Sequence, residues 1–561
     1  MVKLFKKILA ILVVLTLSLT TLFACTKDVT ISKNAPENDK DIVLLFTNDV
    51  HCAVDDNIGY AALAEYKKRL ANDNYVILAD AGDFSQGAPI GTLSKGLFLV
   101  DIMKKVGYDF CIPGNHEFDY NMANFLQNCL ELNNLIFSSN FIDLRNNKSV
   151  LPPYKIFSLG NKKVALVGAT TPESFTKSTP TYFQDSMGKY IYTLSEDNNG
   201  RKLYRNIQKA VNDARKEGAD YVILIGHLGI DGTTERWKST TVIANTTGID
   251  AVIDGHSHEV YNQMVKNKRG REIPLVQTGT KLKNIGQLTI NKAGEISIQM
   301  VDHVVPIDGS PVENERGQKI HAKDPEVDRF IKDIQAKYQD SIKEVIIPTN
   351  KVNLITTFPF SKDRAVRKAE TNLGDLCADA YRTVLGADIG FMNGGGIRNE
   401  IPLGNVTYED CLKVMPFNNL ATLIKCKGQV IKDALEMGAH LFPEENGGFI
   451  HVSGLTYTID GTIPSSVKLD DKNNFVSVDG EYRVRDIKVD GKDLDLNKEY
   501  SVACHDYMLI NGGDGYTMFK GSEVLKDRIM PDVDALVEYL KAEGTSNYTN
   551  LAGAGRITII Q

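Results

Sequence analysis

Short apolar runs rich in β-branched residues recur through the first half of the chain, and amphipathic stretches separate several of them. The runs cover residues 42–46, 75–78, 164–167, 221–225 and 251–253. Each is bounded by polar residues or glycine, as buried strands are. The stretches 61–71 and 200–218 repeat apolar residues at helical spacing. This alternation predicts an α/β domain whose sheet carries helices on its faces, with polar residues gathered just past the strand ends.

A second domain is expected because the chain has 561 residues and single cores stop growing at roughly 250–300 residues. In the stretch 324–344, an Asp-Pro-Glu start and apolar residues at helical spacing predict a solvated helix that connects the domains. We therefore expect a first domain at 41–305, a linker with this helix at 306–350, and a second domain at 351–561. A net charge of -7 without any Lys/Arg block argues against a nucleic-acid polymer as partner.

The N-terminus has the pattern of an export signal. Lys3, Lys6 and Lys7 precede an uncharged apolar run at 8–24. A run of this length could also serve as a membrane anchor, but it ends Leu22-Phe23-Ala24-Cys25, which resembles the lipobox of bacterial lipoproteins. The resemblance implies a signal peptide at 1–24, a lipidated Cys25 with a polar tether at 25–40, and a cell-envelope lipoprotein held to a lipid bilayer by acyl chains.

The remaining cysteines predict neither a disulfide framework nor a structural zinc site. They are odd in number, irregularly spaced and without a CxxC pair: Cys52, Cys111, Cys129, Cys377, Cys411, Cys426 and Cys504. We expect most of them to be buried as small apolar residues.

Five segments of the first domain concentrate side chains that bind metals. They are residues 48–51, 82–83, 114–119, 226–227 and 254–258, and they contain five of the ten histidines of the chain. Asp49 and His51 are two apart at a predicted strand end, so we expect their side chains to point to one side, and likewise those of His256 and His258. Carboxylate, imidazole and amide groups together suit a divalent ion such as zinc, manganese or iron.

In this order, Asp-x-His, Gly-Asp, Gly-Asn-His-Glu, Gly-His and Gly-His-Ser-His resemble the calcineurin-like dinuclear metallophosphoesterases, specifically the bacterial 5'-nucleotidase and UDP-sugar hydrolase family. The resemblance implies a four-layer α/β sandwich and two divalent ions, which could be Zn, Mn, Co or Mg. It implies Asp83 as the bridging ligand and His116 as a proton donor held by Asp119. The implied ligand sets are Asp49, His51, Asp83 and His258 for one ion, and Asp83, Asn115, His227 and His256 for the other.

The second domain resembles the α/β nucleotide-binding domain of the same family through its motifs at 364–367, 370–375, 393–398, 416–419 and 512–516. The resemblance implies that Arg367, Arg398 and Asn393 bind the phosphate and that Asp514 accepts from the ribose hydroxyls. It also implies a base stacked between two aromatic rings. Phe417 matches one ring; the other family position holds Met508, and we assign this role to Tyr507 instead.

Together these features predict a metal-dependent hydrolase of extracellular nucleotides. The favoured reaction converts a nucleoside 5'-monophosphate and water to a nucleoside and phosphate, with nucleotide sugars and nucleoside di- and triphosphates as further substrates. A 2',3'-cyclic phosphodiesterase with 3'-nucleotidase activity is the alternative within the class. A surface lipoprotein that binds nucleosides without catalysis is the alternative from another class. The oligomeric state, the metal identity and the preferred base stay open.

Overall fold

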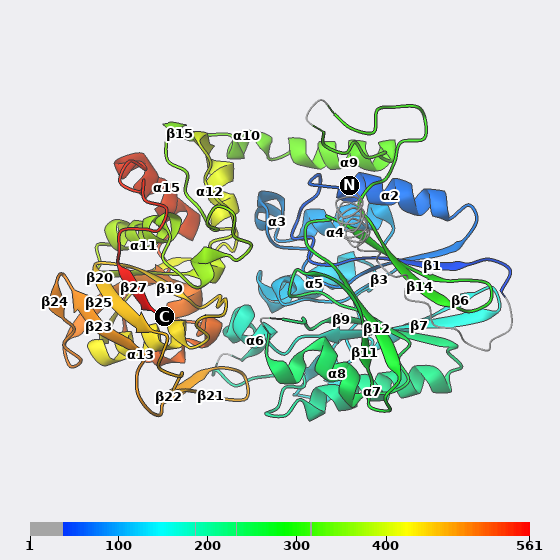
Figure 1. The fold of residues 1–561 in the computed structure, drawn as a ribbon, viewed down its shortest axis with the longest axis horizontal. Coiled ribbons are helices and arrows are strands. Elements are labelled where there is room, and N and C mark those ends of the chain that lie inside the picture. The colour runs from blue at the N-terminus through cyan, green and yellow to red at the C-terminus, as the bar shows by residue number, and fades with distance from the viewer. Residues whose placement is uncertain (1–37, 186, 232, 315–316) are drawn as a thin grey trace, which may run out of the picture.

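The computed structural model describes residues 38–185, 187–231, 233–314 and 317–561. The predicted signal peptide and Cys25 lie outside the described residues. Within the described part of the chain, no helix is both long and apolar enough to cross a membrane. The chain forms two bodies side by side, with the first domain on the right and the second on the left in Figure 1.

Two sheets stack face to face in the first domain. One has the order β14-β13-β1-β2-β3, and the other has the order β11-β12-β10-β9-β7-β6. A shared core of apolar side chains from both sheets lies between them. The bounds are β1 Ile42–Thr47, β2 Tyr75–Asp80, β3 Phe110–Cys111, β6 Tyr154–Leu159, β7 Lys162–Thr170, β9 Tyr221–His227, β10 Ala251–Ile253, β11 Val260–Lys266, β12 Glu272–Thr278, β13 Ile285–Ile290 and β14 Ile296–Val301.

Helices cover the outer faces of both sheets and complete four layers. Helices α2 (Gly59–Leu70) and α4 (Leu97–Val106) pack on the first sheet, and α7 (Arg201–Lys216) and α8 (Ser239–Asn245) pack on the second. Figure 1 shows these helices above and below the paired sheets. The predicted α/β sandwich is confirmed, and the five predicted strands form β1, β2, β7, β9 and β10.

The predicted connector helix forms α9, Pro325–Ala336, and Asp324 caps it by accepting from the backbone of Glu326 and Val327. It is not solvated on all sides, however. Val327, Ile331 and Ile334 are buried in the same core as α2 and α4. Helix α9 is therefore an outer element of the first domain, and the short helix α10 (Gln339–Ile342) leads from it to the second domain. There β15, Val345–Asn350, pairs with β17, Gly404–Thr407.

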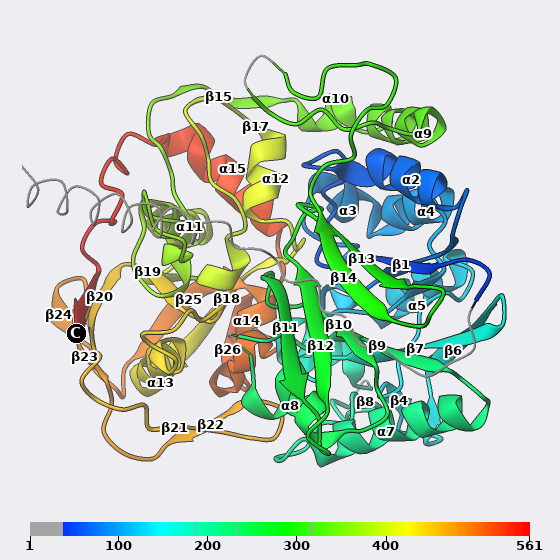
Figure 2. The same ribbon diagram turned by 45° about the vertical axis from the view of Figure 1, so that its right-hand side comes forward.

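The second domain is built on a sheet with the order β19-β16-β25-β18-β26. Its strands are β16 Ile389–Asn393, β18 Ala421–Lys427, β19 Ile450–Ser453, β25 Glu499–His505 and β26 Glu523–Lys526. Helices α11 (Asn372–Leu385) and α15 (Asp532–Glu543) pack on one face, and α13 (Gly428–Ala439) packs on the other. A smaller sheet, β24-β23-β20-β27, adjoins this core. Its strands are β20 Leu455–Asp460, β23 Val484–Val489, β24 Lys492–Asp493 and β27 Ile557–Ile560. In Figure 2 this sheet lies on the side of the second domain away from the first domain.

The seven cysteines of the described residues are buried and form no disulfide, as predicted. Burial raises the pKa of their thiols, for example that of Cys426 to about 12. They contribute to the cores as small apolar side chains.

Candidate metal centre and nucleotide cleft

Most of the predicted ligands lie in loops that follow the strands at one edge of the two sheets, and His227 is the last residue of β9. Asp49 and His51 follow β1, Asp83 follows β2, and His256 and His258 follow β10. All five have positive φ angles, between 48° and 85°. The expectation that strand alternation aligns these pairs is therefore wrong, because their backbone is left-handed rather than extended. Non-glycine residues adopt this conformation at a cost of order 1–3 kcal/mol each, which the surrounding fold must offset.

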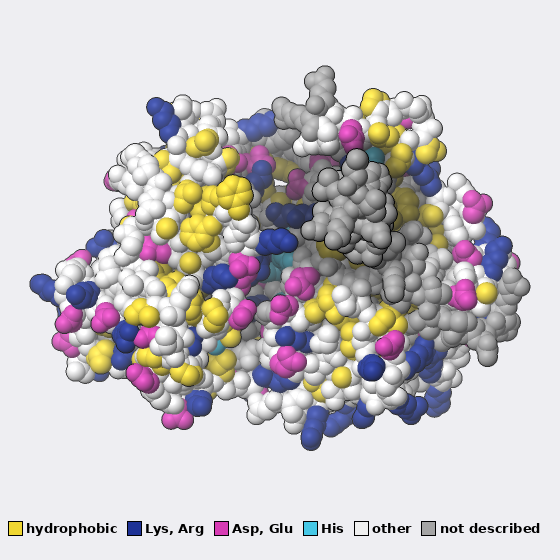
Figure 3. Space-filling model, in the orientation of Figure 1, with side chains coloured by type: hydrophobic (Ala, Val, Ile, Leu, Met, Phe, Trp, Pro, Cys, Tyr) yellow, Lys and Arg dark blue, Asp and Glu magenta, His cyan; other side chains and the backbone are white. Residues whose placement is uncertain are grey.

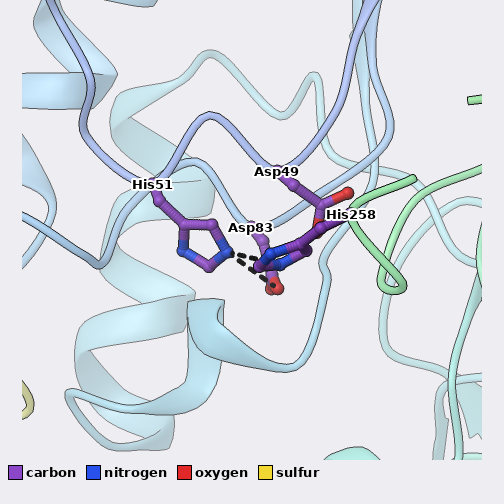
Figure 4. Close-up of side chains that lie close together, drawn as sticks. All are labelled: Asp49, His51, Asp83 and His258. Carbon is purple, nitrogen blue, oxygen red and sulfur yellow. Dashed lines mark hydrogen bonds and ion pairs between the residues drawn. The ribbon is translucent and has the colours of Figure 1, made fainter. Parts of the chain in front are cut away.

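The first cluster contains Asp49, His51, Asp83 and His258, whose ligand atoms lie within 4.8 Å of one another. Figure 4 shows the rings of His51 and His258 directed toward each other beside Asp83. Their Nε2 atoms are 3.0 Å apart, and His258 Nε2 is 3.3 Å from Asp49 Oδ1. Two imidazole nitrogens at this separation require a proton or a cation between them.

The second cluster contains Asp83, His227 and His256, and it shares Asp83 with the first. His227 Nε2 lies 3.2 Å from Asp83 Oδ2. Asn115 Oδ1 is buried and has no hydrogen-bond partner among the described residues. A buried amide oxygen without a partner costs free energy unless a ligand occupies its lone pairs, so its chemistry fits a cation at this place.

Three histidines of these clusters are fixed in orientation by a hydrogen bond from the other ring nitrogen. His51 Nδ1 donates to Gln86 O at 2.9 Å, and His227 Nδ1 donates to Ala81 O at 2.7 Å. His256 Nε2 donates to Glu173 Oε2 at 2.9 Å. In each case the second nitrogen keeps its lone pair for the centre, which is the usual arrangement of a metal-binding histidine.

The electrostatics of the centre depend on burial and on close pairs of opposite charge. Burial raises the pKa of Asp49, but His258 outweighs this effect and lowers the pKa to about 2. Burial lowers the pKa of His258 to about 4. For His227, the adjacent Asp83 outweighs burial and raises the pKa to about 10. The carboxylates that stabilise a proton on His227 would stabilise a metal cation in the same place.

Glu173 is a residue that the sequence-based prediction missed. Besides His256, it accepts from the backbone N–H and the hydroxyl of Thr234. It follows β7 at the same sheet edge as the other polar residues, and this position is the signal that could have revealed it. The Glu173 carboxylate therefore fixes the ring of His256.

Glu117 has a structural role. Its carboxylate accepts five hydrogen bonds, from the backbone of Asp83, Phe84, Ser85 and Gly114 and from the hydroxyl of Ser85. It thus joins the loop that carries Asp83 to the loop that carries Asn115.

His116 lies beside the centre and is held by Asp119. His116 Nδ1 donates to Asp119 Oδ2 at 2.6 Å, and the His116 backbone donates to Asp83 Oδ1 at 2.9 Å. Burial lowers the pKa of His116, but the carboxylates of Asp119 and Asp83 outweigh burial and raise it. No hydrogen bond joins His116 Nε2 to the residues that the structure describes, so this nitrogen is available to a substrate, as a general acid requires.

The second domain places an aromatic ring and arginines next to His116. The Phe417 ring centroid is 5.5 Å from that of His116, and the Arg398 guanidinium lies 5.6 Å from the Phe417 ring centre. Arg367 Nε is buried, and it has no hydrogen-bond partner in the part of the chain that the structure describes. Burial and the neighbouring Arg364 lower the pKa of Arg398 to about 10. Clustered guanidinium groups of this kind suit an anion with several oxygens. Figure 3 shows basic side chains and histidine in the hollow between the domains.

Asn393, Tyr507 and Asp514 lie together in the second domain. Asn393 Nδ2 donates to Asp514 Oδ2 at 2.8 Å, and the Asp514 backbone donates to the Tyr507 hydroxyl at 3.0 Å. Met508 is fully buried in the core, whereas Tyr507 is partly exposed. Among the described residues, no ring contact joins Tyr507 to Phe417; the Tyr507 ring packs against His505 instead, with centroids 5.7 Å apart.

Comparison with known proteins identifies both domains. The model of the calcineurin-like phosphoesterase family matches residues 42–260, and that of the 5'-nucleotidase C-terminal domain matches residues 349–521. The chain is 28% identical to snake venom 5'-nucleotidase of Gloydius brevicauda, over 90% of this chain and 87% of that protein. It is 26% identical to 5'-nucleotidase of Vibrio cholerae, over 92% of this chain and 93% of that protein.

The fold also matches solved structures. The 5'-nucleotidase precursor from Thermus thermophilus superposes with a TM-score of 0.75 and 24% sequence identity, covering 93% of this chain and 99% of that one. The match extends over both domains, so the two-domain architecture is shared.

Proposed function

Since the chain belongs to the calcineurin-like phosphoesterases that carry a 5'-nucleotidase C-terminal domain, we propose that it hydrolyses nucleoside 5'-monophosphates to nucleoside and phosphate. The family is a family of metal-dependent hydrolases of phosphoric esters, and two divalent ions are its cofactors. The observation that carries the proposal is the pair of ligand clusters that share Asp83 and lie beside His116 and Phe417.

The residues fit two ions, and we assign them as follows. Asp49, His51, Asp83 and His258 hold one ion, while Asp83, Asn115, His227 and His256 hold the other. When bound, such a pair of ions activates water and screens the charge of the phosphate oxygens. The fixed ring nitrogens and the left-handed loops hold the ligands in place before any ion or substrate arrives, which reduces the cost of reorganisation.

The remaining roles belong to the chain's own side chains. Arg367 and Arg398 bind and orient the phosphate, helped by Asn393. His116 donates a proton from Nε2 to the leaving 5' oxygen, while Asp119 keeps the proton of Nδ1 in place and stabilises the charged ring. Phe417 stacks on the base.

For the nucleoside, Asp514 accepts from the ribose hydroxyls. The role of Tyr507 as a second stacking ring requires a rearrangement, because its ring and hydroxyl are engaged by neighbours in this arrangement of the domains.

A substrate panel tests the proposed reaction. The purified chain is assayed with 5'-AMP, 3'-AMP and cyclic 2',3'-AMP in the presence of Mn²⁺, Zn²⁺, Co²⁺ or Mg²⁺. Release of phosphate and adenosine from 5'-AMP, at a higher rate than from the other two, is the expected result. Preference for the cyclic nucleotide would indicate the alternative phosphodiesterase, and binding of adenosine without hydrolysis would indicate a non-catalytic nucleoside-binding protein.

Two variants test the assigned roles. Asp83→Ala removes the shared ligand, so both ions and nearly all activity should be lost. His116→Ala should retain the ions, measured by elemental analysis, and lower kcat by about 10²–10⁴-fold. Equal loss of metal from both variants would refute the division between ligand and proton donor.

We also propose that the chain is exported and anchored by acyl chains on Cys25. The support is the sequence alone: a basic start, an apolar run and the Leu22–Cys25 segment that resembles a lipobox. Incorporation of a labelled fatty acid into the wild type but not into Cys25→Ser, together with loss of the variant from the membrane fraction, is the expected outcome. Equal labelling of both proteins would contradict the proposal.

A further inference from the structure

The short helix α6, Ser174–Lys177, brings the first domain into contact with the nucleoside-binding residues of the second. In Figure 1 it lies between the two bodies. Thr176 O accepts from the Tyr507 hydroxyl at 2.6 Å, and Lys177 Nζ lies 3.1 Å from Asp514 Oδ1. One helical turn thus contacts both residues to which we assigned the nucleoside.

Lys177 and Asp514 form a defined pair rather than a loose surface contact. The Asp514 side chain is 6% exposed and that of Lys177 is 35% exposed. Asp514 is further held by Asn393, which donates to its other oxygen, and by a left-handed backbone with φ of 50°. Although burial lowers the pKa of Lys177, Asp514 and Glu173 outweigh burial and raise it, so the ammonium stays charged.

We propose that Lys177 is a specificity-determining residue that donates a hydrogen bond to a ribose hydroxyl held by Asp514. This inference rests on the proposed function and adds a sugar contact from the metal-binding domain. A hydroxyl both donates and accepts, and the ion pair offers the matching partners side by side. Asp514 Oδ1 accepts a hydrogen bond from the ribose hydroxyl. The Lys177 ammonium has three N–H donors; one donates to Asp514, and another donates to the oxygen of the hydroxyl.

A nucleotide without that hydroxyl leaves the ammonium donor unpaired in a partly buried site. Sites built to hydrogen-bond a substrate hydroxyl discriminate strongly against the analogue that lacks it, because their polar groups lose a partner. Selection of ribose over deoxyribose would then depend on both domains coming together around the substrate.

A purely structural role for Lys177, as a link between the domains, is the competing explanation. The chain offers a matched control for it. Lys472 of the second domain lies 2.8 Å from Glu196 Oε1 of the first, and both side chains are largely buried. Lys472 has no contact with Asp514, Asn393 or Tyr507 among the described hydrogen bonds and ion pairs.

The test compares 5'-AMP, 2'-deoxy-AMP and 3'-deoxy-AMP as substrates of the wild type, Lys177→Met and Lys472→Met, with the metal that supports the highest activity. The wild type should have a higher kcat/KM for AMP than for either 2'-deoxy-AMP or 3'-deoxy-AMP, whichever lacks the hydroxyl that Lys177 contacts. This preference should fall by about tenfold or more in Lys177→Met, the value of a hydrogen bond to a charged group. It should be unchanged in Lys472→Met and partly restored in Lys177→Arg.

An unchanged ratio in Lys177→Met, or an equal change in Lys472→Met, would overturn the inference. Failure of the proposed function has a different result, namely no hydrolysis of 5'-AMP by the wild type. In that case calorimetry compares the affinities of the same variants for adenosine, 2'-deoxyadenosine and 3'-deoxyadenosine. This measurement needs no turnover. Selective loss of affinity for adenosine in Lys177→Met supports the contact, and equal affinities across the variants refute it.

Discussion

Glu117 connects the two loops that carry Asp83 and Asn115, so its replacement should destabilise the first domain and the metal centre together. Oε2 accepts from the backbone of Asp83 at 2.8 Å and of Gly114 at 2.7 Å. Oε1 accepts from the backbone of Phe84 and Ser85 and from the Ser85 hydroxyl. Glu117 itself is 3% exposed, so water cannot replace these bonds without opening the loops.

The substitution Glu117→Gln keeps the shape of the side chain and changes only its hydrogen bonding. Whichever way the amide turns, its NH₂ group faces two backbone N–H donors, and these lose their acceptor. A buried donor without a partner costs about 1–3 kcal/mol, so the free energy of unfolding should fall by about 2–6 kcal/mol. With about 2–4 °C per kcal/mol for a domain of this size, the Tm should fall by at least about 4 °C.

Thermal unfolding followed by circular dichroism measures this loss with and without EDTA. The loss should persist in EDTA, because the five hydrogen bonds need no metal. With metal present the difference should grow, because displaced Asp83 and Asn115 bind ions less tightly and bound ions stabilise the folded state. Glu131→Gln is the control, since within the described residues the Glu131 carboxylate accepts a single, exposed hydrogen bond from Gln127 of the same helix.

Two results would refute this reasoning. A Tm of the metal-free Glu117→Gln protein within about 2 °C of the wild type would mean that the stranded donors find other acceptors. A loss seen only with metal present would mean that Glu117 acts on ion binding alone and not on the fold of the two loops.

Three further predictions concern a buried carboxyl, a residue that orients a metal ligand, and the base site. Burial, together with Glu370, raises the pKa of Asp375 to about 8; the folded state therefore favours the neutral acid, and the contribution of Asp375 to stability should fall as the pH rises from about 4 to 8. Asp375→Asn should lessen the fall of the unfolding free energy over this range in urea unfolding, and an unchanged slope would contradict the prediction. Glu173→Gln should weaken the metal affinity of one site about 10–100-fold in calorimetry, because the contact with His256 is lost. Equal metal affinities of the wild type and the variant would show that this contact is dispensable. Phe417→Ala should raise the KM for 5'-AMP about tenfold but spare ribose 5-phosphate, and parallel changes would rule out base stacking.

Local patterns in the sequence were sufficient to predict the main elements. The apolar runs 42–46, 75–78 and 221–225 form β1, β2 and β9. The sequence predicted a helix where α9 forms, but we expected this helix to be solvated. Its apolar face packs on α2 and α4, a long-range contact that spacing within the helix cannot reveal.

The sequence by itself determined which residues can act at the centre, because ligand type and order along the chain are local properties. Only the tertiary structure decided how they act. The left-handed backbone that directs Asp49 and His51 toward the centre is held by the surrounding fold. The ring of His51 is fixed by the carbonyl of Gln86, and Lys177 contacts Asp514 of the other domain. Both contacts join residues that are distant in the sequence. Such contacts depend on how separate strands and domains pack against each other. The pattern of neighbouring residues in the sequence does not predict this packing.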